Sequence, residues 1–169
     1  MTYSIVAVCP KSGQIGAAVQ THQFGVGRIV PGVEAGVGAV ATQAQANTAF
    51  GPDGLQRLRA GESPAEALAA MLEADGGAAH RQVGIVDAAG RTAAHTGERC
   101  IAEASHVSGE GFTTHANMML EQGGAEEMAA AFTTTSGRLW ERLSAALDAA
   151  EGLGGDIRGR QSAALVERS

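Results

Sequence analysis

A threonine next to the initiator methionine has the most direct route to chemistry in this sequence. Thr2 follows Met1, a residue that aminopeptidases commonly remove before small side chains. A threonine hydroxyl is a weak nucleophile unless a base accepts its proton, and a free α-amino group with a pKa of about 7.7–8.0 can be that base on the same residue. Removal of Met1 therefore predicts a nucleophile with its own base, whereas retention of Met1 would acylate the amine. The alternative is that threonine is simply common at this position.

Ser4 is the second candidate catalytic residue. It lies two positions after Thr2 in TYSIVAVC, so on a strand both side chains share one face. We therefore expect Ser4 to contact the Thr2 side chain. The alternative is a strand serine paired with a neighbouring residue.

A second polar group follows the apolar stretch GVGAVATQAQAN. Thr42, Gln43 and Asn47 lie where a strand is expected to give way to a helix, and side-chain amides there can donate hydrogen bonds to a substrate. We expect Gln43 and Asn47 to line a substrate cleft. Asn47 has an equally good alternative, since asparagine often caps the following turn through a local hydrogen bond.

The third polar group is the turn GDIRGRQS near the C-terminus. Asp156 is a candidate for orienting the Thr2 amine, and a substrate carboxylate can bind an arginine in bidentate fashion. The alternative is a structural ion pair that holds the turn. The candidate substrate-binding residues of this group, together with a histidine that follows the second expected strand, are Arg158, Arg160, Ser162 and His22.

Several other chemistries find no support in the sequence. The remaining histidines show no metal-ligand spacing such as HExxH, so we predict no metal site; they are His80, His95, His106 and His115. The fragments GVG and GEG lack the full GxGxxG pattern, and neither a P-loop nor a GxSxG elbow occurs. We predict no bound cofactor.

The amino-acid composition limits the classes of binding partner that we expect. The 169 residues include 18 acidic and 12 basic ones, a formal net charge of −6, which repels a phosphate backbone and argues against nucleic acid. No apolar run approaches the length of about 18 residues that spans a bilayer, and no signal peptide is recognisable. We therefore expect no membrane association and a cytoplasmic location. Cys9 and Cys100 are expected to be buried apolar residues.

The candidate residues must be positioned by strands and hairpins. Residues 2–9 and 14–21 are expected to form a hairpin around PKSG, and residues 80–97 form the clearest hairpin of the sequence around DAAG. A further hairpin is expected to turn at residues 31–32, and short strands are expected between 107 and 116. The polar turn after residue 155 is expected to enter a last strand.

Two pairs of helices are expected between these strands. A short helix near residues 54–59 precedes SPAEALAAMLEAD, in which Ser63 is a natural N-cap, Pro64 occupies the first turn and Glu66 completes a capping box. EEMAAAF and the segment after Ser136, its expected cap, form the second pair. Strands, helices, strands, helices and a strand in this order predict an α+β chain, a single domain over residues 1–169, with two mainly antiparallel sheets covered by helices on their outer faces.

Taken together and in order, TYSIVAV, GVGAVATQAQAN, FGPDGLQRLRAG, RQVGIVDAAGRTAAHTG and GGDIRGRQSAAL resemble the DUF1028 family of bacteria and archaea. That family is regarded as part of the N-terminal-nucleophile hydrolase superfamily, and the element order also resembles a proteasome β-subunit. The resemblance implies a four-layer αββα sandwich with Thr2 as the nucleophile of an amide-bond hydrolase. The partner would be a small amide or peptide-like substrate.

Family members usually continue beyond the equivalent of Val166, so we expect this chain to lack their C-terminal segment. An edge strand left open in this way predicts a homodimer. The rival interpretation is a catalytically silent homologue that keeps the fold and serves as a binding or assembly module.

Overall fold

The computed structural model describes residues 2–169, so the state of Met1 lies outside the described residues. Nine strands and four α-helices alternate along this part of the chain. In order the elements are β1 (Thr2–Cys9), β2 (Gln14–Thr21), the 3-10 turn η1 (Val26–Arg28), β3 (Pro31–Glu34), β4 (Gly38–Ala44), α1 (Phe50–Arg59), α2 (Pro64–Glu73), η2 (Ala78–His80), β5 (Arg81–Asp87), β6 (Thr92–Thr96), β7 (Ser105–Gly109), β8 (Phe112–Asn117), α3 (Gly124–Thr134), α4 (Leu139–Gly152) and β9 (Ser162–Arg168).

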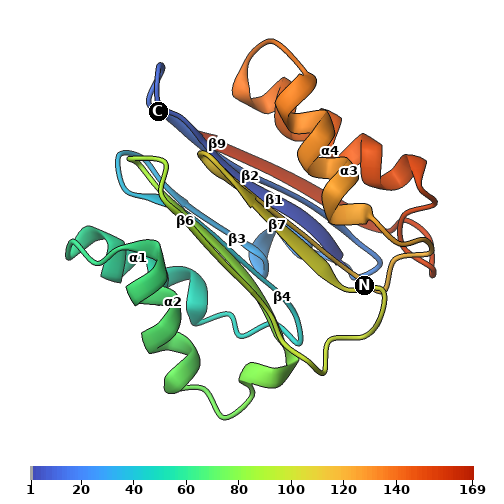
Figure 1. Cartoon of the computed structure of the whole chain (residues 1–169), viewed down its shortest axis with the longest axis horizontal. Coiled ribbons are helices and arrows are strands. Elements are labelled where there is room, and N and C mark those ends of the chain that lie inside the picture. Colours follow the sequence, from blue (N-terminus) through green and yellow to red (C-terminus); the bar gives the residue numbers. More distant parts are fainter. Residues whose placement is uncertain (1) are drawn as a thin grey trace.

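The strands form two antiparallel sheets. The first has five strands in the order β7-β8-β1-β2-β9, and the second has four in the order β3-β4-β5-β6. Helices α3 and α4 cover the first sheet on one side of the molecule, and α1 and α2 cover the second on the other (Figure 1). The predicted α+β chain with two antiparallel sheets and four helices is confirmed.

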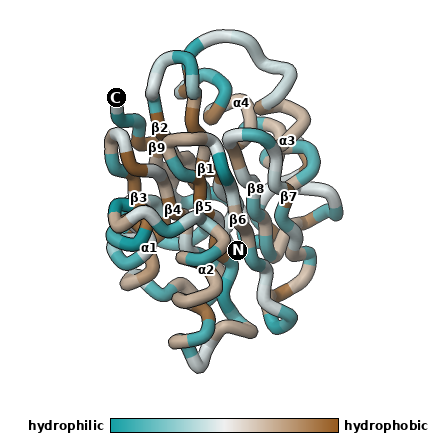
Figure 2. Tube along the Cα trace, turned by 60° about the vertical axis from the view of Figure 1, so that its left-hand side comes forward, coloured by the Kyte–Doolittle hydropathy of each residue, from teal (hydrophilic) through white to brown (hydrophobic). Residues whose placement is uncertain are grey.

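Alternation along β1 explains why its residues enter two different cores. Tyr3, Ile5 and Ala7 pack against α3 and α4. Val6 and Val8 point the other way and pack with residues of β2 and β4 in the space between the two sheets. Because both faces are covered, most of β1 is buried, and the hydrophobic stretches lie along the central strands (Figure 2).

The helix starts follow local rules. At α2, the Ser63 side chain accepts a hydrogen bond from the Glu66 amide and Pro64 begins the helix, as predicted. The predicted cap at Ser136 is wrong. Helix α4 has Arg138 as its N-cap, and the Glu141 carboxylate accepts the Arg138 amide hydrogen at 2.6 Å, which starts the helix two residues later.

Two further expectations need correction. Pro31 does not lie in the turn of the second hairpin but begins β3, an edge strand in which the missing amide of proline is tolerated. The turn lies at residues 35–37, where Gly36 adopts a φ of 70°. Cys9 and Cys100 are half-buried rather than buried, because each lies at the end of a strand or in a loop.

Strand β9 lies at an edge of the five-stranded sheet. The homodimer expected from such an edge stays a prediction. None of the helices in residues 2–169 has the length and apolar character needed to cross a bilayer.

Candidate active site at the beginning of strand β1

Thr2 begins the central strand of the five-stranded sheet. Its register partners are Thr21 on β2 and Asn117 on β8, so the backbone of Thr2 has a paired strand on each side. The side chain faces the space between the sheets, where Thr2 Oγ1 lies 3.0 Å from Thr21 Oγ1. Thr2 is only 9% exposed, so its hydroxyl is held at one place.

Gln43 reaches across from β4 and links the two sheets at this point. Its Nε2 donates to the Thr2 carbonyl at 3.1 Å and to Gln82 Oε1 at 2.7 Å, while its Oε1 accepts a hydrogen bond from Ser4 Oγ at 2.6 Å. The expectation that Gln43 lines an open cleft is wrong, because this side chain is buried and its amide is committed to these contacts. It holds the backbone of Thr2.

Ser4 takes part in this network rather than contacting the Thr2 side chain as expected. The Oε1 atom of Gln43 can only accept, so Ser4 Oγ donates its single hydrogen to it. Ser4 Oγ therefore accepts a hydrogen bond from His115 Nδ1, 3.1 Å away. His115 Nε2 then accepts from Thr113 Oγ1 at 2.6 Å. The hydrogen bonds therefore all run in the same direction, from Thr113 through His115 and Ser4 to Gln43.

His115 is fully buried and electrically neutral. Burial lowers the pKa of His115 to about 3, because the charged imidazolium would lose its hydration, and the nearby His106 acts in the same direction. The ring fits because Gly84 faces it: a Cβ at position 84 would lie 1.8 Å from His115 Nε2. The role of Gly84 is to leave space for the histidine.

Gln82 and Asn117 complete this polar interior. Gln82 Nε2 donates to the Ala116 carbonyl at 2.9 Å, and Asn117 Nδ2 donates to Gln82 Oε1 at 2.9 Å. The name "polar end" is used below for the buried, uncharged side chains of this region: Thr2, Ser4, Thr21, Gln43, Gln82, Thr113, His115 and Asn117.

The turn around Asp156 lies at the same end of the five-stranded sheet, because His22 directly follows the register partner of Thr2. The Asp156 carboxylate is fully buried and accepts hydrogen bonds from the His22 amide at 3.0 Å and from the amide and guanidinium of Arg158. Burial acts to raise the pKa of Asp156, but these hydrogen bonds outweigh it and hold the pKa below its usual range. The carboxylate is thus ionised at neutral pH.

The other candidate residues of this turn form ion pairs or hydrogen bonds with other residues of the protein. Arg158 forms the ion pair with Asp156 that the structural alternative predicted, and its side chain is 40% exposed. Arg160 pairs with Glu151 at 2.7 Å and is mostly exposed. Ser162 Oγ donates to the Gln23 carbonyl at 2.9 Å and so fastens β9 to the loop after β2.

Asn47 lies in the loop between β4 and α1. Its Oδ1 accepts the Ala49 amide hydrogen at 3.1 Å, just before α1. This is the local capping bond of the alternative interpretation, and the expectation that Asn47 lines a substrate cleft stays a prediction.

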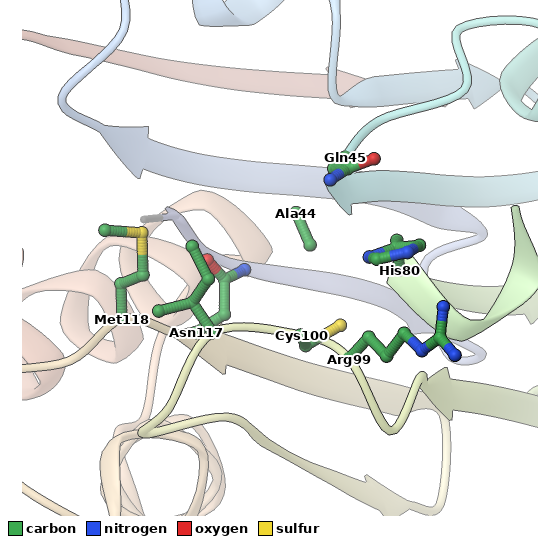
Figure 3. A pocket seen from close by; sticks show the side chains of 8 residues that line it. Ala44, Gln45, His80, Arg99, Cys100, Asn117 and Met118 are labelled. Carbon is green, nitrogen blue, oxygen red and sulfur yellow. The ribbon is translucent and has the colours of Figure 1, made fainter.

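A small cavity lies beside the polar end and was not expected from the sequence. Its volume is about 90 Å³, and its lining comes from Ala44 and Gln45 at the end of β4, His80 in η2, the loop 99–101, and Asn117 with Met118 at the end of β8 (Figure 3). Ala44 and Met118 have positive φ angles of 67° and 52°. Such backbone strain in residues other than glycine clusters at functional sites.

Within residues 2–169, no group of three or more histidine, cysteine, aspartate or glutamate side chains is arranged to hold a metal ion. His115, Gln82 and Asn117 were not predicted from the sequence as residues of this site. A signal did exist: polar residues occupy alternate positions of β1 and β8, where a core strand would have apolar ones.

Fold and site together define a mixed α+β protein with two antiparallel sheets, outer helices and a buried polar end, which does not by itself fix a reaction. The chain belongs to the family of unknown function DUF1028, whose family model matches residues 2–168. It is similar to the crystal structure of protein SPO2555 from Silicibacter pomeroyi, also described as DUF1028. The two are 34% identical with a TM-score of 0.92, over 99% of this chain and 73% of that chain. No curated protein matches the sequence significantly.

Proposed function

We propose that this protein is an amide-bond hydrolase of the N-terminal-nucleophile type, with Thr2 as its nucleophile once Met1 has been removed. The observation that carries the proposal is the position of Thr2 at the start of the central strand, facing the polar end. The Thr21 hydroxyl lies 3.0 Å from Thr2 Oγ1. Asn117, opposite Thr2 in register, lines the adjacent cavity.

The arrangement of layers supports the same class. Helix pair, sheet, sheet and helix pair follow one another across the molecule (Figure 1). We propose that these layers are the four-layer αββα sandwich of N-terminal-nucleophile hydrolases.

In the proposed reaction Thr2 Oγ1 attacks the carbonyl carbon of an amide while the Thr2 α-amine accepts the hydroxyl proton. The carbon–nitrogen bond then breaks, and the departing amine takes that proton from the α-ammonium. Water attacks the resulting ester of Thr2 with the α-amine again as base, which releases a carboxylic acid and restores the hydroxyl. Asp156, ionised and at the same end of the sheet, is the proposed partner of the α-ammonium.

The test compares protein whose chain begins at Thr2 with Thr2→Ala, Thr2→Ser and a form with one extra residue before Thr2. Hydrolysis of a panel of small amides and N-acyl amino acids is followed by chromatography. We expect Thr2→Ala and the extended form to lose activity by at least about a thousandfold, because each lacks the nucleophile or the base. Thr2→Ser should keep part of the activity. Equal rates in all four proteins would refute the mechanism.

The low exposure of Thr2 favours one rival, a silent homologue that binds a partner without turnover. A substrate must reach a hydroxyl that is 9% exposed and already bonded to Thr21. Intact-mass measurement of protein produced without a tag separates the two, since quantitative retention of Met1 would favour the rival.

A further inference from the structure

The cavity beside the polar end is placed to receive part of a substrate. Asn117 lines it and is also the register partner of Thr2. On the opposite sheet, Gln43 bonds to the Thr2 carbonyl and the next residue, Ala44, lines the cavity. On the five-stranded sheet the register partner of Thr2 therefore lines the cavity itself, and on the other sheet the lining begins one residue after Gln43.

The volume of the cavity limits what fits. A cavity of about 150 Å³ in another protein holds benzene, which has six non-hydrogen atoms. The volume of about 90 Å³ here scales to a group of about four such atoms. The side chains of Ala44, Ile101 and Met118 give part of the wall an apolar character suited to a methylene group.

The charge at the cavity is positive. The backbone of Arg99 is fixed by a hydrogen bond from its amide to the Ala79 carbonyl at 2.8 Å. Its exposed side chain extends away from Asn117, on the side of the cavity where His80 lies (Figure 3). The neighbouring Arg81 is committed to Asp75 at 2.7 Å. Across residues 2–169, by contrast, no carboxylate lies within ion-pair distance of Arg99. Arginine is the side chain best suited to a planar carboxylate.

We propose that this cavity binds a –CH2–COO⁻ group, with the carboxylate on Arg99 and the methylene against the apolar wall. The carboxymethyl group has four non-hydrogen atoms and one negative charge, which match the volume and the cation. Its other end would place an attached amide beside Asn117, toward Thr2. The substrate class is then an N-acylglycine or a similar amide of a very small amino acid. Turnover of this class rests on the proposed function, but its binding does not.

The test measures binding separately from turnover. Thr2→Ala protein is titrated with N-acetylglycine by isothermal calorimetry, alongside N-acetylglycinamide, which lacks the charge, and N-acetylphenylalanine, which is too large. The variants are Arg99→Gln and, as a matched control, Arg168→Gln. Arg168 pairs with Ile15 at the opposite end of the sheet, so its loss removes the same charge at a distance.

N-acetylglycine should bind most tightly, and both the neutral amide and Arg99→Gln should weaken binding by at least about tenfold, while Arg168→Gln leaves it unchanged. Equal binding of the acid and its amide, an unchanged affinity in Arg99→Gln, or no binding at all would overturn the proposal. Each of these outcomes can occur with the wild-type enzyme still hydrolysing another amide through Thr2, and binding can occur without hydrolysis. Failure of this assignment and failure of the proposed function are therefore distinguishable.

Discussion

The space between the two sheets has two contrasting halves. At one end Val6, Val8 and Ile15 pack with Ala39 and Val86 in a wholly apolar cluster. At the polar end, strands β1, β4 and β5 continue with uncharged polar side chains that hydrogen-bond across the sheets. The same strands thus change character along their length.

The contrast indicates a division of roles. An apolar cluster stabilises the fold through its buried apolar area and its packing, so conservative substitutions there change the free energy of unfolding gradually. A buried polar network costs free energy wherever one donor or acceptor is left unpaired, so it tolerates few arrangements. The apolar half stabilises the pairing of the sheets, and the polar end fixes one geometry around Thr2.

The largest effect is expected from Gly84→Ala. The added Cβ would lie 1.8 Å from His115 Nε2 and 2.4 Å from Thr113 Oγ1, so the ring must move and its hydrogen bonds must break. We expect a loss of at least about 3 kcal/mol in the free energy of unfolding, measured with urea. The double variant Gly84→Ala/His115→Ala should recover part of this loss. Additive losses would show that the two residues do not interact.

A smaller, pH-dependent effect is expected from His115→Phe. The ring volume is kept, but Thr113 and Ser4 lose their partner, which costs about 1–3 kcal/mol at pH 7.5. In the wild type the folded pKa is about 3, below the usual unfolded value of about 6.5. The unfolded state therefore binds the extra proton, and stability falls as the pH drops below about 6.5.

This part of the pH dependence amounts to about 1.4 kcal/mol per pH unit, or about 2 kcal/mol between pH 6.5 and 5. His115→Phe should lack it. Urea unfolding of both proteins at pH 7.5 and 5.0 measures the difference, in which the other histidines cancel. Parallel losses in the two proteins would mean that His115 is not neutral in the folded state.

The smallest effect is expected in the apolar half, from Ile15→Val. Removing one buried methylene should cost about 1 kcal/mol, without changing the pH dependence of unfolding or the activity. A loss of activity in Ile15→Val with its fold intact would contradict the division of roles between the two halves.

The sequence predicted most of the strands and helices because their signals are local. The turn PKSG predicted the first hairpin, now seen as β1 and β2, and the Ser63 capping box predicted the start of α2. The turn of the second hairpin was misplaced because Pro31 is a turn signal as well as a permitted first residue of an edge strand. Local patterns do not distinguish these two uses.

The candidate site was predicted only in part, because its contacts join distant segments. Thr2, Ser4 and Gln43 were recognised, but Ser4 was expected to serve the wrong neighbour. His115 lies 111 positions from Ser4, and their contact depends on β8 pairing with β1, which no local pattern reveals. The cavity was missed for the same reason, since four separate segments line it.

The ends of the chain have a practical consequence for attaching this protein to a surface or a fusion partner. Strand β9 runs from Ser162, beside Thr21, to Arg168, beside Ile15. Six steps along a strand carry the chain about 20 Å away from the Thr2 end. A linker placed after Ser169 therefore leaves the polar end and its cavity open to solutes, whereas any extension before Thr2 is built directly onto the candidate site.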